Sequence, residues 1–191
     1  YFFMKKWQYF LGVLVLIVVV LGGYYFYRTK MNNNQPGARA DYELIDRSNY
    51  GLYSSISDGD KNFEKYKGMS AWIFADVSEW KRFWETDIRQ IGTGGFDDYP
   101  RVDFEKKRVL ALLQGIKPTG GFYMEIKELS FSGKKLIVKV NIVEPKEGES
   151  QTQAISSPYD IIKFDKEILD GKTTLEIWDT NSGKLVLSQK I

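Results

Sequence analysis

Between Val102 and Ile191 the chain is a succession of short apolar or alternating segments with turn residues between them. Apolar–polar alternation with a period of two is typical of a half-buried strand, and a short continuous apolar run is typical of a fully buried one. The predicted strands are RVLALLQG (108–115), FYMEIKEL (122–129), KLIVKVNIV (135–143), YDIIKFDK (159–166), TLEIWD (174–179) and KLVLSQKI (184–191). Turns at Ser132-Gly133 and at TNSG (180–183) predict two hairpins.

The preceding part of the chain adds strands and one helix. YELID (42–46) is an expected strand, residues 51–56 are a further short candidate, and MSAWIFAD (69–76) is an apolar run rich in aromatics. In the segment that follows, Ser78 is expected to cap a short helix whose core-facing stripe is Trp80, Phe83 and Trp84. The predicted fold class is mainly β with one short helix (a minor α+β character). We expect an antiparallel β-sandwich or open barrel of seven or eight strands.

The N-terminal segment carries a long uncharged run. Residues 7–27 contain no charged side chain and would span roughly 31 Å as a helix, close to the thickness of a bilayer core. Tryptophan and tyrosines lie at its two ends, as in the aromatic belts of membrane helices. A cleaved signal peptide is the alternative, but no Ala-x-Ala pattern follows the run. We expect one transmembrane helix, which makes the lipid bilayer the partner of residues 7–27.

This segment defines the domain organisation. Residues 1–30 are the predicted anchor, residues 31–41 a polar linker, and residues 42–191 a β-rich domain. A short N-terminal tail before the span predicts a single-pass protein of the cell membrane with its C-terminal domain outside the cytoplasm. Residues 1–3 precede the first methionine, Met4, and are interpreted as lying upstream of the natural start.

Composition excludes several kinds of function. The chain has no cysteine and no histidine, so thiol chemistry, histidine bases and the usual nitrogen and sulfur metal ligands are absent. Residues 41–191 carry 22 basic and 25 acidic side chains, a net charge of about −3, which is not the footprint of a nucleic-acid-binding domain. The sequence therefore predicts a protein that is not an enzyme, binds no cofactor or metal and has no nucleic-acid partner.

The segment KPTGGF (117–122) is the candidate partner-binding loop. Pro118 fixes its own φ, and Gly120 and Gly121 permit a chain reversal, so a tight hairpin turn between two strands explains these residues. A rigid loop with an aromatic neighbour is also a plausible protein contact. The candidate contact residues are Lys117, Pro118, Thr119, Gly120, Gly121, Phe122, Pro158 and Tyr159, with Ser156 and Ser157 beside them.

Several motifs together resemble those of one known family. They are a Val-Asp-Phe motif (102–104), a Gly-x-x-Pro-Thr-Gly-Gly-aromatic turn (115–122), a late Pro-Tyr strand (158–159) and an upstream Glu-Trp…Trp helix (79–84). In this combination, residues 78–166 resemble the C-terminal domain of the protease complex subunit PrcB. Phe122 stands where that family has tyrosine, so a hydroxyl is missing from the turn.

The resemblance implies a non-catalytic module of the bacterial cell envelope with a protein partner, a protease in at least one system. It implies a binding or assembly role, such as an accessory subunit of an envelope protease complex. Two alternatives remain open. The KPTGGF segment is also similar to a loop of chagasin-like cysteine-protease inhibitors, in which a rigid loop enters the protease cleft. The second alternative is an enzyme. It would have to use carboxylates such as Asp97 and Asp98, or Ser132 with Lys135. The segment from Ser132 to Lys135 is, however, typical of a hairpin turn.

Overall fold

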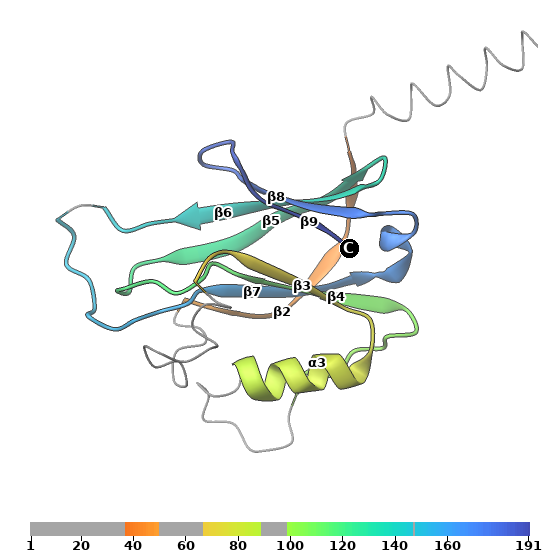
Figure 1. The fold of residues 1–191 in the computed structure, drawn as a ribbon, viewed down its shortest axis with the longest axis horizontal. Helices are drawn as coiled ribbons and strands as arrows, with labels where there is room; N and C mark the ends of the chain where they lie inside the picture. Colours follow the sequence, from red (N-terminus) through yellow and green to blue (C-terminus); the bar gives the residue numbers. More distant parts are fainter. Residues whose placement is uncertain (1–36, 50–66, 89–98, 147) are drawn as a thin grey trace, which may run out of the picture. The chain divides into compact units, whose positions relative to one another are not determined.

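The computed structural model describes residues 37–49, 67–88, 99–146 and 148–191, which form two β-sheets and a short helix (Figure 1). The five-stranded sheet has the order β1-β5-β6-β8-β9, formed by β1 (Ala38–Ala40), β5 (Tyr123–Ser132), β6 (Lys135–Val143), β8 (Thr174–Asp179) and β9 (Leu185–Lys190). The four-stranded sheet has the order β2-β7-β4-β3, formed by β2 (Tyr42–Ser48), β7 (Tyr159–Asp165), β4 (Lys107–Leu113) and β3 (Ser70–Phe74).

The two sheets confirm the predicted mainly β fold, and they do not close into a barrel. The prediction of a wholly antiparallel fold is wrong at one place, because β6 and β8 pair in parallel. The reason lies in the path of the chain. After β6 it enters the other sheet as β7, passes the 3-10 helix Lys166–Leu169 and returns beside β6 as β8. A parallel pair needs such a crossover connection.

The main core lies between the two sheets. Alternate residues of β6 and β8 point inward, so Leu136, Val138 and Val140 pack against Leu175 and Ile177, and all five are fully buried. The predicted strand at residues 135–143 is therefore confirmed, with the alternation that its sequence indicated. The predicted hairpins are confirmed as well, since β5 pairs with β6 and β8 with β9 around the expected turns.

A second core lies on the outer face of the four-stranded sheet, where α3 (Val77–Phe83) packs and a π-helical turn (Trp84–Ile88) follows (Figure 1). Trp80 is fully buried there and its ring centroid lies 5.6 Å from that of Phe74, so the core-facing stripe is confirmed. The predicted cap is wrong by two residues. Asp76, not Ser78, is the N-cap, because its carboxylate accepts hydrogen bonds from the backbone N–H groups of Ser78 and Glu79.

Some predictions fall outside the described residues: the membrane span at 7–27, the candidate strand at 51–56 and the carboxylates Asp97 and Asp98. Among the helices that the structure does describe, none has the length and apolar character needed to cross a bilayer.

Candidate functional site

The loop that contains KPTGGF joins the two sheets. We call residues 114–122 the crossover loop, because β4 lies in the four-stranded sheet and β5 in the five-stranded sheet. The predicted tight hairpin is therefore wrong. Strand β4 is central, with β7 on one edge and β3 on the other, and its residues Val109–Leu113 are fully buried. No edge of β4 is left for β5, so the chain has to cross to the other sheet.

A second segment holds the crossover loop along its length. We call residues 151–158 the strap; it runs into β7. Lys117 and Ser156 exchange two backbone hydrogen bonds of 2.7 and 3.0 Å. The Gly120 N–H donates to the Thr152 carbonyl at 2.9 Å, and the Ser156 hydroxyl donates to the Thr119 carbonyl at 2.8 Å. Because these hydrogen bonds pair backbone N–H and carbonyl groups of the loop, the shape of the loop is largely fixed before any partner binds.

Two glycines of the loop have a conformation that other residues rarely adopt. Gly115 has φ +88°, and a Cβ there would lie 2.8 Å from backbone atoms of Gly68. Gly121 has φ +86°, and a Cβ there would overlap the side chain of Gln151. Gly120 does not have a positive φ, although a Cβ would meet the Thr152 hydroxyl. Backbone geometry therefore requires glycine at 115 and 121, whereas at 120 the strap is the obstacle.

The exposed face of the loop is small, apolar and basic. Pro118 and Gly121 are exposed, while Lys117, Thr119 and Phe122 are half-buried. The Lys117 ammonium lies 5.2 Å from the centroid of the Phe122 ring, which is a cation–π distance. These five residues are the part of the predicted contact set that solvent reaches, and we call them the loop face.

The other predicted contact residues lie below the loop face. Gly120, Ser156, Ser157, Pro158 and Tyr159 are buried. The Pro158 carbonyl accepts a hydrogen bond of 2.8 Å from the Gln114 N–H, which ties the strap to the end of β4. The Tyr159 hydroxyl donates to the Asp46 carboxylate at 2.6 Å. These residues support the loop and do not lie on its surface.

A partly buried ion pair between β2 and β7 lies beside Tyr159. Asp160 is fully buried, and its Oδ2 accepts hydrogen bonds from the Arg47 guanidinium at 2.8 Å and from the Ile126 N–H at 2.6 Å. The same guanidinium lies 3.4 Å from Glu125 on β5. The ion pair therefore links both sheets. It does so next to the ends of the loop and the strap, since β5 begins just after Phe122 and β7 just after Pro158.

Burial sets the ionisation of these groups. Burial raises the pKa of the Asp160 carboxyl above its ordinary value, against the lowering effect of the bonds from Arg47 and Ile126. Burial, and then the hydrogen bond to Asp46, raises the pKa of the Tyr159 hydroxyl, so this group stays a protonated donor. Sequence reasoning missed the ion pair. Its one signal was an aspartate at the start of the otherwise apolar run YDIIKF.

Two of the residues proposed for the enzyme alternative, Ser132 and Lys135, lie in the described part of the chain, and both have structural roles. Ser132 and Lys135 are paired residues at the β5–β6 turn, as the hairpin interpretation predicted. The Lys135 ammonium lies 2.7 Å from the Glu176 carboxylate and forms an ion pair with it. Within the described ranges, no three acidic side chains gather as a metal site would require.

Comparison with protein families gives a match to part of the chain. The model of the PrcB C-terminal family matches residues 108–165, a segment that covers nearly all of β4, the crossover loop, β5, β6, the strap and β7. The helix α3 lies outside the match, so the matched part is shorter than the predicted 78–166. The searches of curated proteins and of solved structures found no match. The resemblance predicted from the sequence is confirmed over the matched residues, where the chain is similar to the PrcB C-terminal family.

Proposed function

We propose that this chain is a non-catalytic binding and assembly module, anchored in the cell membrane, and an accessory subunit of an envelope protease complex. The observation that carries the proposal is the position of the loop face within the matched segment. The family match covers both the crossover loop and the strap that fixes it.

Physical chemistry supports a protein as the partner of the loop face. A preorganised loop loses little conformational entropy on binding, and an aromatic ring beside a rigid proline is a typical interface anchor. The Lys117 ammonium adds a single positive charge beside Phe122. A partner surface with an apolar pocket rimmed by carboxylates would complement it.

The membrane anchor rests on the sequence. Residues 7–27 form an uncharged run of membrane-spanning length. We propose that residues 42–191 lie outside the cytoplasm, at the envelope face where a secreted or membrane-bound protease would be met, because the similarity to the PrcB family implies an envelope module.

Two features support a non-catalytic role. The chain lacks both histidine and cysteine. The charged side chains that link the two sheets, Arg47 and Asp160, bind each other, and Asp160 also accepts a hydrogen bond from a backbone N–H group. They are therefore occupied with joining the two sheets.

Site-specific photo-crosslinking tests the proposal. A photoreactive amino acid replaces Pro118 in the full-length chain, which is expressed in its native membrane and irradiated. We expect one dominant crosslinked partner, identified by mass spectrometry as a subunit of a protease complex. The control carries the same group at Lys134, which is exposed in the turn at the far end of β5. Equal crosslinking from both positions, or none from position 118, would remove the loop face as the contact.

An activity assay distinguishes an assembly subunit from a protease inhibitor. The purified full-length chain is added to the crosslinked protease and to a panel of cysteine proteases. An assembly subunit leaves peptide hydrolysis unchanged or raises it. An inhibitor lowers it in proportion to its concentration, and the Phe122→Ala variant then loses the effect.

A further inference from the structure

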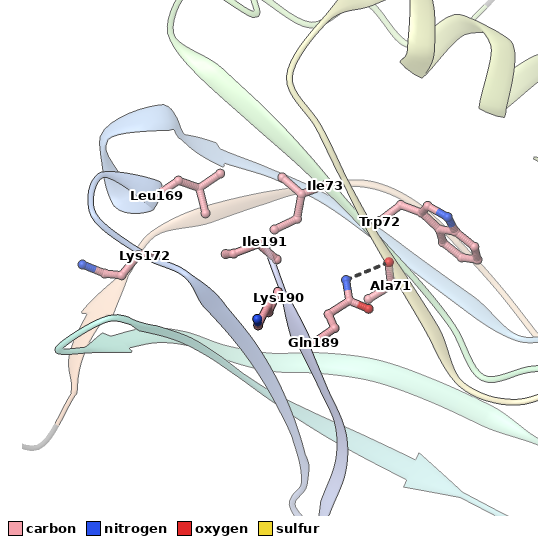
Figure 2. Close-up of a pocket in the computed structure, with 8 residues that line it drawn as sticks. All are labelled: Ala71, Trp72, Ile73, Leu169, Lys172, Gln189, Lys190 and Ile191. Carbon is pink, nitrogen blue, oxygen red and sulfur yellow. Dashed lines mark hydrogen bonds between the residues drawn. The ribbon is translucent and has the colours of Figure 1, made fainter.

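A pocket lies at the side of the sandwich where two strand edges meet. Strand β3 is the last strand of the four-stranded sheet and β9 the last of the five-stranded sheet. Among the described residues, no backbone hydrogen bond joins β3 to β9. A pocket of about 480 Å³ occupies the space between them, within the range of sites that bind ligands (Figure 2).

The edge of β3 presents backbone groups to this pocket. The Gln189 side chain, from β9, donates a hydrogen bond of 3.1 Å to the Ala71 carbonyl (Figure 2). That carbonyl therefore points away from β4 and toward β9. Because the bonding direction of the backbone alternates along a strand, the peptide groups of Ile73 point the same way. A side-chain amide thus occupies a position that a neighbouring strand would otherwise fill.

The inner wall of the pocket is apolar. Ile73, Leu169 and Ile191 line it from β3, from the 3-10 helix and from the residue after β9 (Figure 2). Ile191 is 41 % exposed, and Ile73 and Leu169 are half-buried. An apolar side chain of a bound molecule would cover this surface.

The rim of the pocket is basic. Lys172 and Lys190 line it, and no acidic residue does. Lys172 lies 3.4 Å from the Asp170 carbonyl and 4.9 Å from the Phe131 ring, and within the described part of the chain neither lysine has a carboxylate partner. Other lysines on the sheets differ. Lys107 and Lys163, for example, lie 2.9 and 3.0 Å from carboxylates.

We propose that this pocket binds an extended peptide segment of a partner protein, which adds to the edge of β3 as a strand. The backbone of the segment bonds to Ala71 and Ile73 and displaces the Gln189 amide. One apolar side chain enters the pocket against Ile73, Leu169 and Ile191. An aspartate or glutamate next to it meets Lys172 and Lys190. This is recognition by β-strand addition, in which main-chain bonds give affinity and alternate side chains give specificity.

Selection from a phage-displayed library of randomised short peptides tests the proposal. The target is the full-length chain in detergent micelles. We expect the enriched peptides to combine β-branched or other apolar residues with at least one acidic residue. Binding of the synthesised peptides is then measured by fluorescence anisotropy. Methylation of alternate backbone nitrogens should abolish binding, whereas methylation of the intervening ones should not, because only one set faces β3.

Matched variants locate the site. The double variant Lys172→Glu/Lys190→Glu should weaken binding by about tenfold or more. Lys146→Glu/Lys184→Glu makes the same charge change at exposed lysines outside the pocket and should alter binding by no more than about twofold. Gln189→Ala should not weaken binding, since the peptide replaces its hydrogen bond. Lys117→Ala should have no effect, which separates this pocket from the loop face.

Three results would overturn the proposal. The first is no enrichment of acidic and apolar peptides. The second is equal loss of affinity in the two double-lysine variants. The third is self-association of the chain that Lys172→Glu/Lys190→Glu abolishes while no peptide binds, because the occupant would then be a second copy of this chain.

Discussion

Arg47 and Asp160 lie 113 residues apart in the sequence, yet they are direct cross-strand neighbours on β2 and β7 and form an ion pair of 2.8 Å. A bulge in β2 between Leu44 and Asp46 makes this possible. In a regular strand Tyr42 and Arg47 would point to opposite faces. The extra residue of the bulge turns both toward the five-stranded sheet, where they reach Ile126 and Glu125 of β5.

The stability of the domain should be sensitive to the loss of one partner of this ion pair. We expect Asp160→Ala to lower the free energy of unfolding by about 3 kcal/mol or more, because it leaves the Arg47 guanidinium and the Ile126 N–H without their acceptor. The double variant Arg47→Met/Asp160→Leu should lose less than the sum of the single variants. Urea denaturation measures all of these values. Strict additivity would show that the two residues act independently.

Acid should destabilise the domain through Asp179. Burial alone would raise the pKa of this carboxyl, but hydrogen bonds from Ser182, Asn181 and Ile142 lower it below the ordinary value. A lowered pKa in the folded state means that the stabilisation is present above the unfolded pKa and is lost as the pH falls through the folded pKa. Asp179→Asn should therefore flatten the acid side of the stability–pH curve below about pH 4.

Ser182→Ala provides the graded control for Asp179. It removes the hydroxyl bond of 2.6 Å but leaves the backbone donors in place, so it should flatten the curve only in part. Chemical denaturation at a series of pH values gives the comparison. Identical curves for Asp179→Asn and the unmodified chain would contradict the expectation.

The glycines of the crossover loop should differ in their tolerance of substitution. Gly121→Val should lower stability by about 1 kcal/mol or more, since a β-branched residue is strained at positive φ. Gly115→Ala should be at least as damaging, because its Cβ would meet the backbone of Gly68, which cannot rotate away. Gly120→Ala should be milder, as the Thr152 side chain can move. Thermal melting ranks the three; no loss for Gly121→Val would refute the role of the turn.

The loop face should affect binding more than stability. Lys117→Ala and Thr119→Ala remove half-exposed side chains, so each should change the free energy of unfolding by no more than about 0.5 kcal/mol. Both should reduce recovery of the crosslinked partner in a pull-down from native membranes. Lys184→Ala, an exposed lysine in the β8–β9 hairpin, is the control. Full recovery with Lys117 and Thr119 both replaced would leave the loop with a structural role only.

The membrane topology is open to a direct test. If residues 7–27 are a retained helix with the domain outside, protease added to intact spheroplasts should digest residues 41–191. Complete protection would reverse the orientation. A mature N-terminus near Arg28 would show that the segment is a cleaved signal peptide.

The sequence determined the local features of this protein. The alternation in residues 135–143 predicted β6 to the residue, and TNSG predicted the β8–β9 turn, because period-two alternation and turn chemistry depend only on neighbouring residues. The same holds for the stripe of Trp80 and Phe83 on α3, which follows from helix periodicity. The motifs around KPTGGF likewise indicated the family whose model matches residues 108–165.

Tertiary structure decided which strands become neighbours. The segment KPTGGF joins two sheets because β4 is buried between β3 and β7. These two neighbours are far apart in the sequence, at residues 70–74 and 159–165. The bulge that aims Arg47 at Asp160 and the pocket between the edges of β3 and β9 also depend on distant pairings. Strand patterns specify which face of a strand is buried but not which partner lies beside it. Partner choice is set by the packing of the whole core, which no local window of sequence contains.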